Sequence, residues 1–196
     1  MMMTALFHTV CEGMRSLFRL RGNAPDTTPQ RGISLNAYLG RWYEQARYEC
    51  FFERGLDHVC ADYAKDEHGG ILITNSGTTA RGRHKEVHGR ATTPQSGVLA
   101  VSFVPPYTWF RSPYHILYVD ESYRMALVSG EGSGYLWLLT RARKADDMTM
   151  RCLLDEAQKR GFDISALRLT LQRTEDEVIN VQNRKSAPKE RKGAGW

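Results

Sequence analysis

Two carboxylates and a cysteine are the residues of this chain whose types could support acid–base or nucleophilic chemistry. Glu44 and Asp62 lie on neighbouring predicted strands, and Cys60 lies two residues before Asp62. An acid paired with a base, or a reactive thiolate, can catalyse proton transfer or covalent chemistry. Carboxylates on strands are more often solvated or salt-bridged, and the chain contains no Gly-x-Ser-x-Gly, His-Glu-x-x-His or Gly-rich phosphate loop. The sequence therefore predicts no catalytic residue.

The cysteines and histidines are spaced unlike a metal site. Cys11, Cys50, Cys60 and Cys152 include no Cys-x-x-Cys pair, which argues against zinc or redox chemistry. Cys50 and Cys60 lie on neighbouring predicted strands, so they could be bridged or could both be free thiols. The six histidines are scattered, and the pair four residues apart falls in a strand pattern. We expect no metal and no cofactor.

The positive charge of the chain lies at its two ends. The formal net charge of the 196 residues is +5, but the stretch 32–183 is nearly neutral. A nucleic-acid-binding fold carries its basic patch on the folded domain, so that class is not expected. No apolar run reaches the ~20 residues that a membrane-spanning helix needs.

Changes in composition along the sequence divide the chain into three parts. Residues 1–32 form an apolar and basic segment followed by a linker, and this segment could be cleaved, lipidated at Cys11 or retained as an amphipathic surface helix. Residues 33–172 form the folded domain. Residues 173–196 form a basic tail that we expect to be disordered.

The folded domain reads as short strands at hairpin spacing followed by one helix. Eight strands are predicted in sequence, at 42–48, 59–64, 71–75, 83–91, 97–104, 114–119, 123–129 and 135–140. Short connections between them predict an all-β, up-and-down antiparallel barrel, and eight strands can enclose one small ligand. A helix at about 146–160 begins near Asp146 or Asp147 and stops at Gly161, and 164–171 supplies a short ninth strand.

Three short motifs fall at the same end of the predicted barrel. Gly40 and Trp42 begin the first strand, Asp120 and Tyr123 lie in the turn after the sixth, and Arg141 follows the eighth. Over residues 33–172 this arrangement resembles the lipocalin family, in its bacterial lipocalin and apolipoprotein D branch. The resemblance implies a calyx closed by the Trp, with the Arg packed across it as a cation on an indole face. The family's usual Thr before the Asp is Val119 here.

Alternation along three strands gives the side chains expected to face the barrel interior. The predicted ligand-binding residues are Leu99, Val101, Phe103, Tyr114, Ile116, Tyr118, Trp137 and Leu139. Large apolar side chains with phenol or indole groups suit an acyl chain, although the same residues could simply fill the barrel as core.

Aromatic residues also gather in the turns at the opposite, open end. The residues expected there to contact a membrane or to form a lid are Phe51, Phe52, Trp109 and Phe110. Arg54, Arg81, Arg83 and Arg111 lie beside them, and such residues suit lipid phosphates.

The family resemblance carries further expectations about function. It implies that the chain binds and transports or stores a small hydrophobic ligand, a fatty acid or lysophospholipid, during membrane or envelope maintenance. It places the protein in the periplasm or at the outer membrane, as a monomer or homodimer. The alternative is a lipid-modifying isomerase or epoxidase on the same scaffold, with Glu44 or Cys60 lining the pocket.

Overall fold

The barrel consists of eight antiparallel strands followed by one helix and a ninth strand. The computed structural model describes residues 24–103, 112–173 and 177. The strands are β1 Gly40–Tyr48, β2 Leu56–Lys65, β3 Ile71–Thr79, β4 His84–Gln95, β5 Val98–Phe103, β6 Ser112–Val119, β7 Met125–Ser129, β8 Trp137–Thr140 and β9 Leu167–Leu169. The helices are α2 Leu35–Tyr38 and α3 Asp147–Lys159, with a 3-10 turn at Ile164–Ala166. The predicted fold is confirmed.

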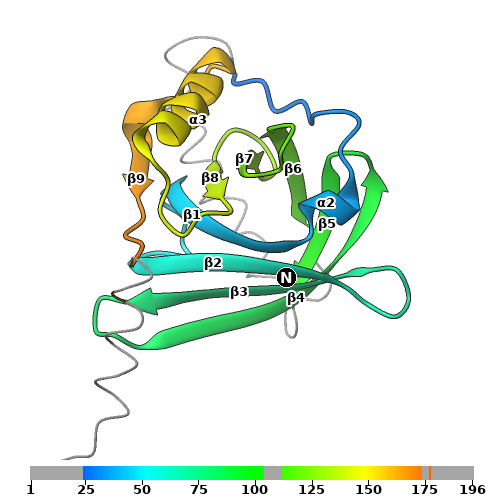
Figure 1. Ribbon diagram of the computed structural model, residues 1–196, viewed down its shortest axis with the longest axis horizontal. Coiled ribbons are helices and arrows are strands. Elements are labelled where there is room, and N and C mark those ends of the chain that lie inside the picture. The colour runs from blue at the N-terminus through cyan, green and yellow to red at the C-terminus, as the bar shows by residue number, and fades with distance from the viewer. Residues whose placement is uncertain (1–23, 104–111, 174–176, 178–196) are drawn as a thin grey trace, which may run out of the picture.

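Strand β1 closes the barrel because it has neighbours on both sides. The sheet runs in the order β2-β3-β4-β5-β6-β7-β8-β1-β9, and β1 also pairs with β2. The pairing with β2 covers only Gly40–Tyr43, and beyond a bulge between Glu44 and Ala46 the place of β2 is taken by β9. In Figure 1 the long strands β2, β3 and β4 run side by side along one side, and α3 lies outside the barrel on the other.

The helix boundaries follow from capping groups that the sequence shows. The Asp146 side chain accepts a hydrogen bond from the Thr149 amide at 2.7 Å, so Asp146 is the N-cap of α3. Gly161 has a φ of 83°, which suits the residue that ends a helix. The four-residue helix α2 was not predicted. Within the described residues, no helix is long and apolar enough to cross a membrane.

Apolar side chains form two separate clusters, one inside the barrel and one outside. The outer cluster packs α3 against the strands through Leu153 and Ala157, which meet residues such as Leu117 and Leu138. The inner cluster lies inside the barrel and includes Trp42, Ile73 and Leu99. Residues of one strand alternate between the two clusters, as the period of two requires.

Trp42 and Arg141 seal one end of the barrel. Trp42 is fully buried, its indole N–H donates to the Tyr38 carbonyl at 2.8 Å, and the Arg141 guanidinium lies 3.9 Å from its ring centre. The same guanidinium donates to the backbone carbonyls of Ala37, Tyr38, Leu39, Arg41 and Tyr123. Arg141 and Trp42 therefore both hold helix α2 over this end.

The other motif residues support the same closed end. Gly40 has a φ of 95°, and a Cβ there would lie 3.2 Å from Arg141 Nη1, which explains the glycine two residues before the Trp. The Asp120 carboxylate accepts from the amides of Arg124 and Met125 and so shapes the β6–β7 turn. Tyr123, at a φ of 53°, accepts from the Ser34 amide through its hydroxyl at 2.7 Å.

Removing Arg141 should destabilise the protein without changing its fold. In Arg141→Ala the indole loses its cation and several carbonyls lose their donor, so we expect the free energy of unfolding to fall by roughly 2–4 kcal/mol. Urea unfolding followed by circular dichroism measures the change, and Lys144→Ala, an exposed neighbour, is the control. Equal midpoints for the two variants would contradict the role given to Arg141.

Candidate functional site

The lumen is sealed at the α2 end and accessible at the opposite end. Tyr38, Trp42 and Ala126 in the inner cluster are fully buried. Towards the other end, Phe103 and Trp137 belong to the same cluster but are only partly buried. Val87 lies opposite Asn75 on the inner face of β4, two residues from buried Gly89, and is 44% exposed. Side chains of the inner face are therefore buried at the α2 end and more exposed at the other end, and we call this interior the cup.

Most of the residues predicted to bind ligand line this cup. The inner cluster contains Leu99, Val101, Phe103, Tyr114, Ile116, Trp137 and Leu139. The expectation for Tyr118 is wrong: a bulge in β6 between Ile116 and Tyr118 turns it outward, where it packs on the outer cluster. Val119 faces the interior instead. That the inward residues bind a ligand stays a prediction.

Three tyrosines inside the barrel form a hydrogen-bonded group. The Tyr63 hydroxyl donates to the Tyr114 hydroxyl at 3.1 Å, and the hydroxyls of Tyr114 and Tyr38 are 2.7 Å apart. Two hydrogen bonds use two of the three hydroxyl hydrogens, so one donor remains without an acceptor among the described residues. Burial raises the pKa of Tyr63 to about 12 and raises the pKa values of Tyr38 and Tyr114 well above their usual value. All three stay neutral at physiological pH.

A group of polar side chains, Glu44, Arg47, Glu53 and Thr170, lies between β1, β2 and β9; we call it the mouth cluster. Arg47 is fully buried and donates to Glu44 Oε1 at 2.5 Å and to the Glu53 and Leu56 carbonyls at 2.7 and 3.2 Å. The Thr170 hydroxyl also donates to Glu44 Oε1. Arg47 therefore ties the β1–β2 turn to strand β1, to which Arg47 belongs.

The two carboxylates of the mouth cluster differ in their partners. Burial, and after it the charge of Glu53, raises the pKa of Glu44 to about 7, although Arg47 opposes this shift. Glu53 Oε2 accepts from the Trp137 indole N–H at 2.9 Å and from the Cys50 thiol at 3.1 Å. Burial and the neighbouring carboxylate raise the pKa of the Cys50 thiol, so this cysteine is a protonated donor.

The residues considered for catalysis do not come together. Glu44 follows Trp42 by two residues and faces the interior, whereas Asp62 forms an ion pair with Arg41 at 2.8 Å on the outer face. Cys60 lies opposite Ser76 and contacts its hydroxyl at 3.2 Å. Both Cys50 and Cys60 are free thiols, so the possible bridge between them is not formed. Among the described residues no group of His, Cys, Asp and Glu could hold a metal ion.

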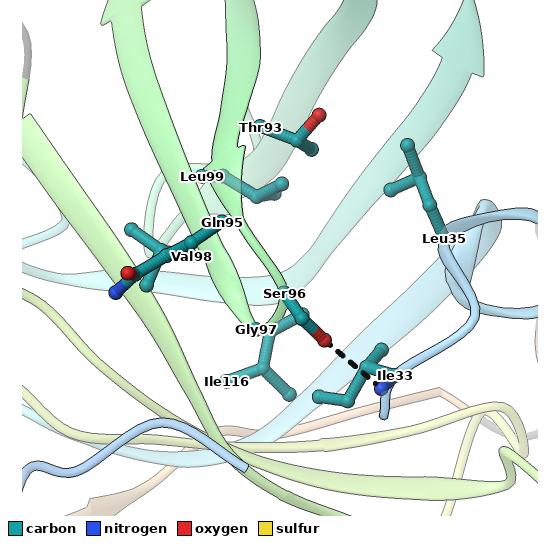
Figure 2. A pocket seen from close by; sticks show the side chains of 9 residues that line it. All are labelled: Ile33, Leu35, Thr93, Gln95, Ser96, Gly97, Val98, Leu99 and Ile116. Carbon is teal, nitrogen blue, oxygen red and sulfur yellow. Dashed lines mark hydrogen bonds between the residues drawn. The ribbon is translucent and has the colours of Figure 1, made fainter. Parts of the chain in front are cut away.

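A cavity of about 230 Å³ lies beside the end of the barrel that Trp42 and Arg141 seal (Figure 2). Ile33 and Leu35 of the α2 region line one side of it, and the β4–β5 hairpin lines the other. Leu99 and Ile116 also line it. The Ile33 amide donates to Ser96 Oγ at 3.2 Å across its edge, shown dashed in Figure 2. This volume is below the ~300–1,000 Å³ typical of ligand pockets. The sequence did not predict it.

Two of the aromatic residues predicted to contact a membrane or to form a lid are exposed. Phe51 is 78% exposed and Phe52 52% exposed. Phe52 stacks on Tyr135 with ring centres 6.2 Å apart, and Tyr135 stacks on Trp137 at 5.8 Å. The other two predicted contacts, Trp109 and Phe110, lie outside the described residues, as do Cys11 and most of both terminal segments.

An eight-stranded cup with an outer helix and a Trp–Arg seal defines a class of ligand-binding barrel, and the family comparison agrees. The family described as "Lipocalin-like domain" matches residues 33–172. This chain belongs to the lipocalin family, whose barrels bind small hydrophobic ligands. It is 37% identical over 148 residues to the outer membrane lipoprotein Blc of Escherichia coli K12, covering 70% of this chain and 82% of that protein.

Two further relatives match a longer stretch of the chain, and a solved structure shares its fold. The Blc protein of Vibrio cholerae is 36% identical, covering 84% of this chain and 96% of that protein. Temperature-induced lipocalin-1 of Arabidopsis thaliana is 32% identical, covering 85% and 91%. Lobster apocrustacyanin A1 has the same fold at 17% identity, with a TM-score of 0.60 and coverage of 77% of this chain and 91% of that one.

Sequence reasoning missed Arg47 and the tyrosine group. Strand alternation from Trp42 places Glu44 inside, but the same count places Arg47 outside because it ignores the β1 bulge. Neither Tyr38 nor Tyr63 is among the predicted interior residues. A signal was present nonetheless, since Tyr63 follows the strand pattern of β2 and Tyr38 lies two residues before the Gly-x-Trp motif.

Neutral, buried tyrosines should make the protein sensitive to alkali. Their folded-state pKa values are raised, so the stability they support is fully present below the unfolded-state pKa of about 10 and is lost as the pH rises towards 12. Each one costs about 1.4 kcal/mol per pH unit in that window. Tyrosinate absorbance near 295 nm and unfolding should coincide, and Tyr63→Phe should weaken the pH dependence. Early titration of all the tyrosines in folded protein would contradict this.

Proposed function

We propose that this lipocalin binds a single-chain acyl lipid, a fatty acid or lysophospholipid, inside the cup and transports or stores it. The observation that carries the proposal is the lumen sealed by Trp42 and Arg141 at one end and accessible at the other, between walls of Leu99, Val101 and Leu139. An acyl chain would lie along these apolar walls, because burial of its methylenes stabilises the complex by ~0.8 kcal/mol each.

The relatives support a place in the cell envelope. Three of the Blc proteins similar to this chain are named outer membrane lipoproteins of enteric bacteria and Vibrio. We propose the same location, with a role in membrane maintenance. An enzymatic role receives no support from the geometry, because Cys60 and Asp62 face away from Glu44.

Filling the cup should abolish binding. Val87→Trp adds a large side chain to the exposed inner face of β4, so an acyl ligand loses its space and the Kd should rise at least tenfold. Leu72→Trp is the matched control, because Leu72 is 39% exposed on the outer face of β3. Lipid mass spectrometry of solvent extracts and calorimetric titration with oleate and lysophosphatidylcholine measure the effect. Equal binding by wild type and both variants would exclude the lumen as the site, and no binding by any of them would refute the proposed function.

We also propose that the open end rests on the membrane while lipid is loaded. Phe51 and Phe52 project from the β1–β2 turn beside Arg54, which is also exposed. Burying one large aromatic side chain in the interface contributes ~1.5–3 kcal/mol, and a basic residue near anionic lipid adds ~1 kcal/mol. The contact is therefore weak and sensitive to salt.

Vesicle co-sedimentation with anionic and neutral lipid tests this contact. Phe51→Ala should reduce recovery on anionic vesicles several-fold at low salt. Met148→Ala is the control, because Met148 is 77% exposed but lies on α3, away from the open end. Equal recovery of the two variants in all conditions would show that the phenylalanines only cover the lumen.

A further inference from the structure

Glu53 is an almost buried carboxylate whose ion pair with Arg47, at 3.9 Å, includes no hydrogen bond. Its side chain is 12% exposed, and the donors on its Oε2 are the neutral indole of Trp137 and thiol of Cys50. The nearest guanidinium atom, Arg47 Nε, is 3.9 Å away and makes no hydrogen bond. An ionised carboxylate out of water is costly unless it is paired, so this position suits a cation from elsewhere.

The nearby cations are already engaged by other carboxylates. Arg47 donates to Glu44 at 2.5 Å and to Glu49 at 3.3 Å. Arg168 is held between Asp57 at 2.9 Å and Glu49 at 3.3 Å. Four carboxylates therefore share two guanidinium groups at this end of the barrel. Within this group of six side chains the surplus charge is negative, whereas Arg54 at the same end is exposed to solvent. The group therefore favours a cationic ligand over a second carboxylate.

Glu44 offers a second acceptor on the wall of the lumen. It is 2% exposed, and both of its contacts, from Arg47 and Thr170, fall on Oε1. No described residue donates to Oε2. Glu44 lies opposite Leu139, and Arg47 lies opposite Trp137, so Glu44 shares the inner face of the sheet with the apolar wall along which an acyl chain would run.

Three stacked aromatic rings connect the surface to Glu53. Phe52, Tyr135 and Trp137 stack in sequence, with interplanar angles of 25° and 10°, from a half-exposed ring to a half-buried one. The hydrogen bond to Glu53 fixes the indole, which is the ring that attracts cations most strongly. Aromatic rings beside a carboxylate are the usual means of recognising an alkylammonium group.

We propose that Glu53, Trp137 and the unpartnered oxygen of Glu44 form a subsite that binds the ammonium head group of an amine-bearing acyl lipid. This inference rests on the proposed function, because the acyl chain occupies the lumen while the ammonium group stays beside Glu53. The subsite makes the barrel selective by head group, since a fatty acid of equal chain length would place a carboxylate against Glu53.

Ligands that share one chain and differ in the head group test the subsite. Dodecylamine, dodecanol and dodecanoate are titrated into wild type, Glu53→Gln and Glu44→Gln at pH 8 and low salt. Wild type should bind dodecylamine at least fivefold more tightly than dodecanol. Glu53→Gln, which keeps an acceptor for the indole, should lose this preference. Glu44→Gln should reduce it.

The control separates the subsite from the general charge of the open end. Glu131→Gln removes an exposed carboxylate from the β7–β8 connection and should leave the preference intact. Equal affinity of wild type for the amine and the alcohol, or equal loss of preference in Glu131→Gln and Glu53→Gln, would overturn the inference while leaving acyl binding in place. Failure of all three ligands to bind would instead refute the proposed function.

Discussion

The barrel depends on one strand, β1, that must serve as the seam of a closed sheet although its two neighbours diverge. β1 pairs with β2 only from Gly40 to Tyr43, and beyond that point the two strands separate. Backbone groups at the split still need partners, because an unsatisfied buried carbonyl costs as much as a lost hydrogen bond. Long polar side chains supply them: Gln172 donates to the Glu44 and Val59 carbonyls at 2.8 and 2.7 Å, and Arg47 and Arg168 both donate to Leu56.

The polar character of the open end follows from that split. A buried arginine in the gap between two strands needs a carboxylate as its partner. Where carboxylates outnumber these arginines, negative charge remains beside the lumen. The opposite end has the reverse arrangement, because Arg141 bonds neutral carbonyls and an indole rather than an acid. The two ends therefore differ in both exposure and charge.

The architecture could be predicted from the sequence because its signals are local. Hairpin spacing, a capped helix and the Gly40–Trp42 motif each occupy a few residues, and each has a local physical cause. The interior could be predicted only where strands are regular. Bulges in β1 and β6 shift the parity by one residue, so Arg47 was missed and Tyr118 was placed wrongly. No local pattern reveals that Tyr38 and Tyr114, 76 residues apart, share a hydrogen bond.

The late position of Gln172 in the chain has a consequence for biosynthesis. Its partner on β2, Val59, precedes it by 113 residues, so the seam cannot be completed until nearly the whole domain has been made. Until then β1 and β2 present unpaired backbone edges, which favour pairing with other chains. Folding dominated by such distant contacts is slow, and partly made chains of this kind aggregate readily. A nascent chain of this protein therefore gains most from protection by a chaperone just before its last strand emerges.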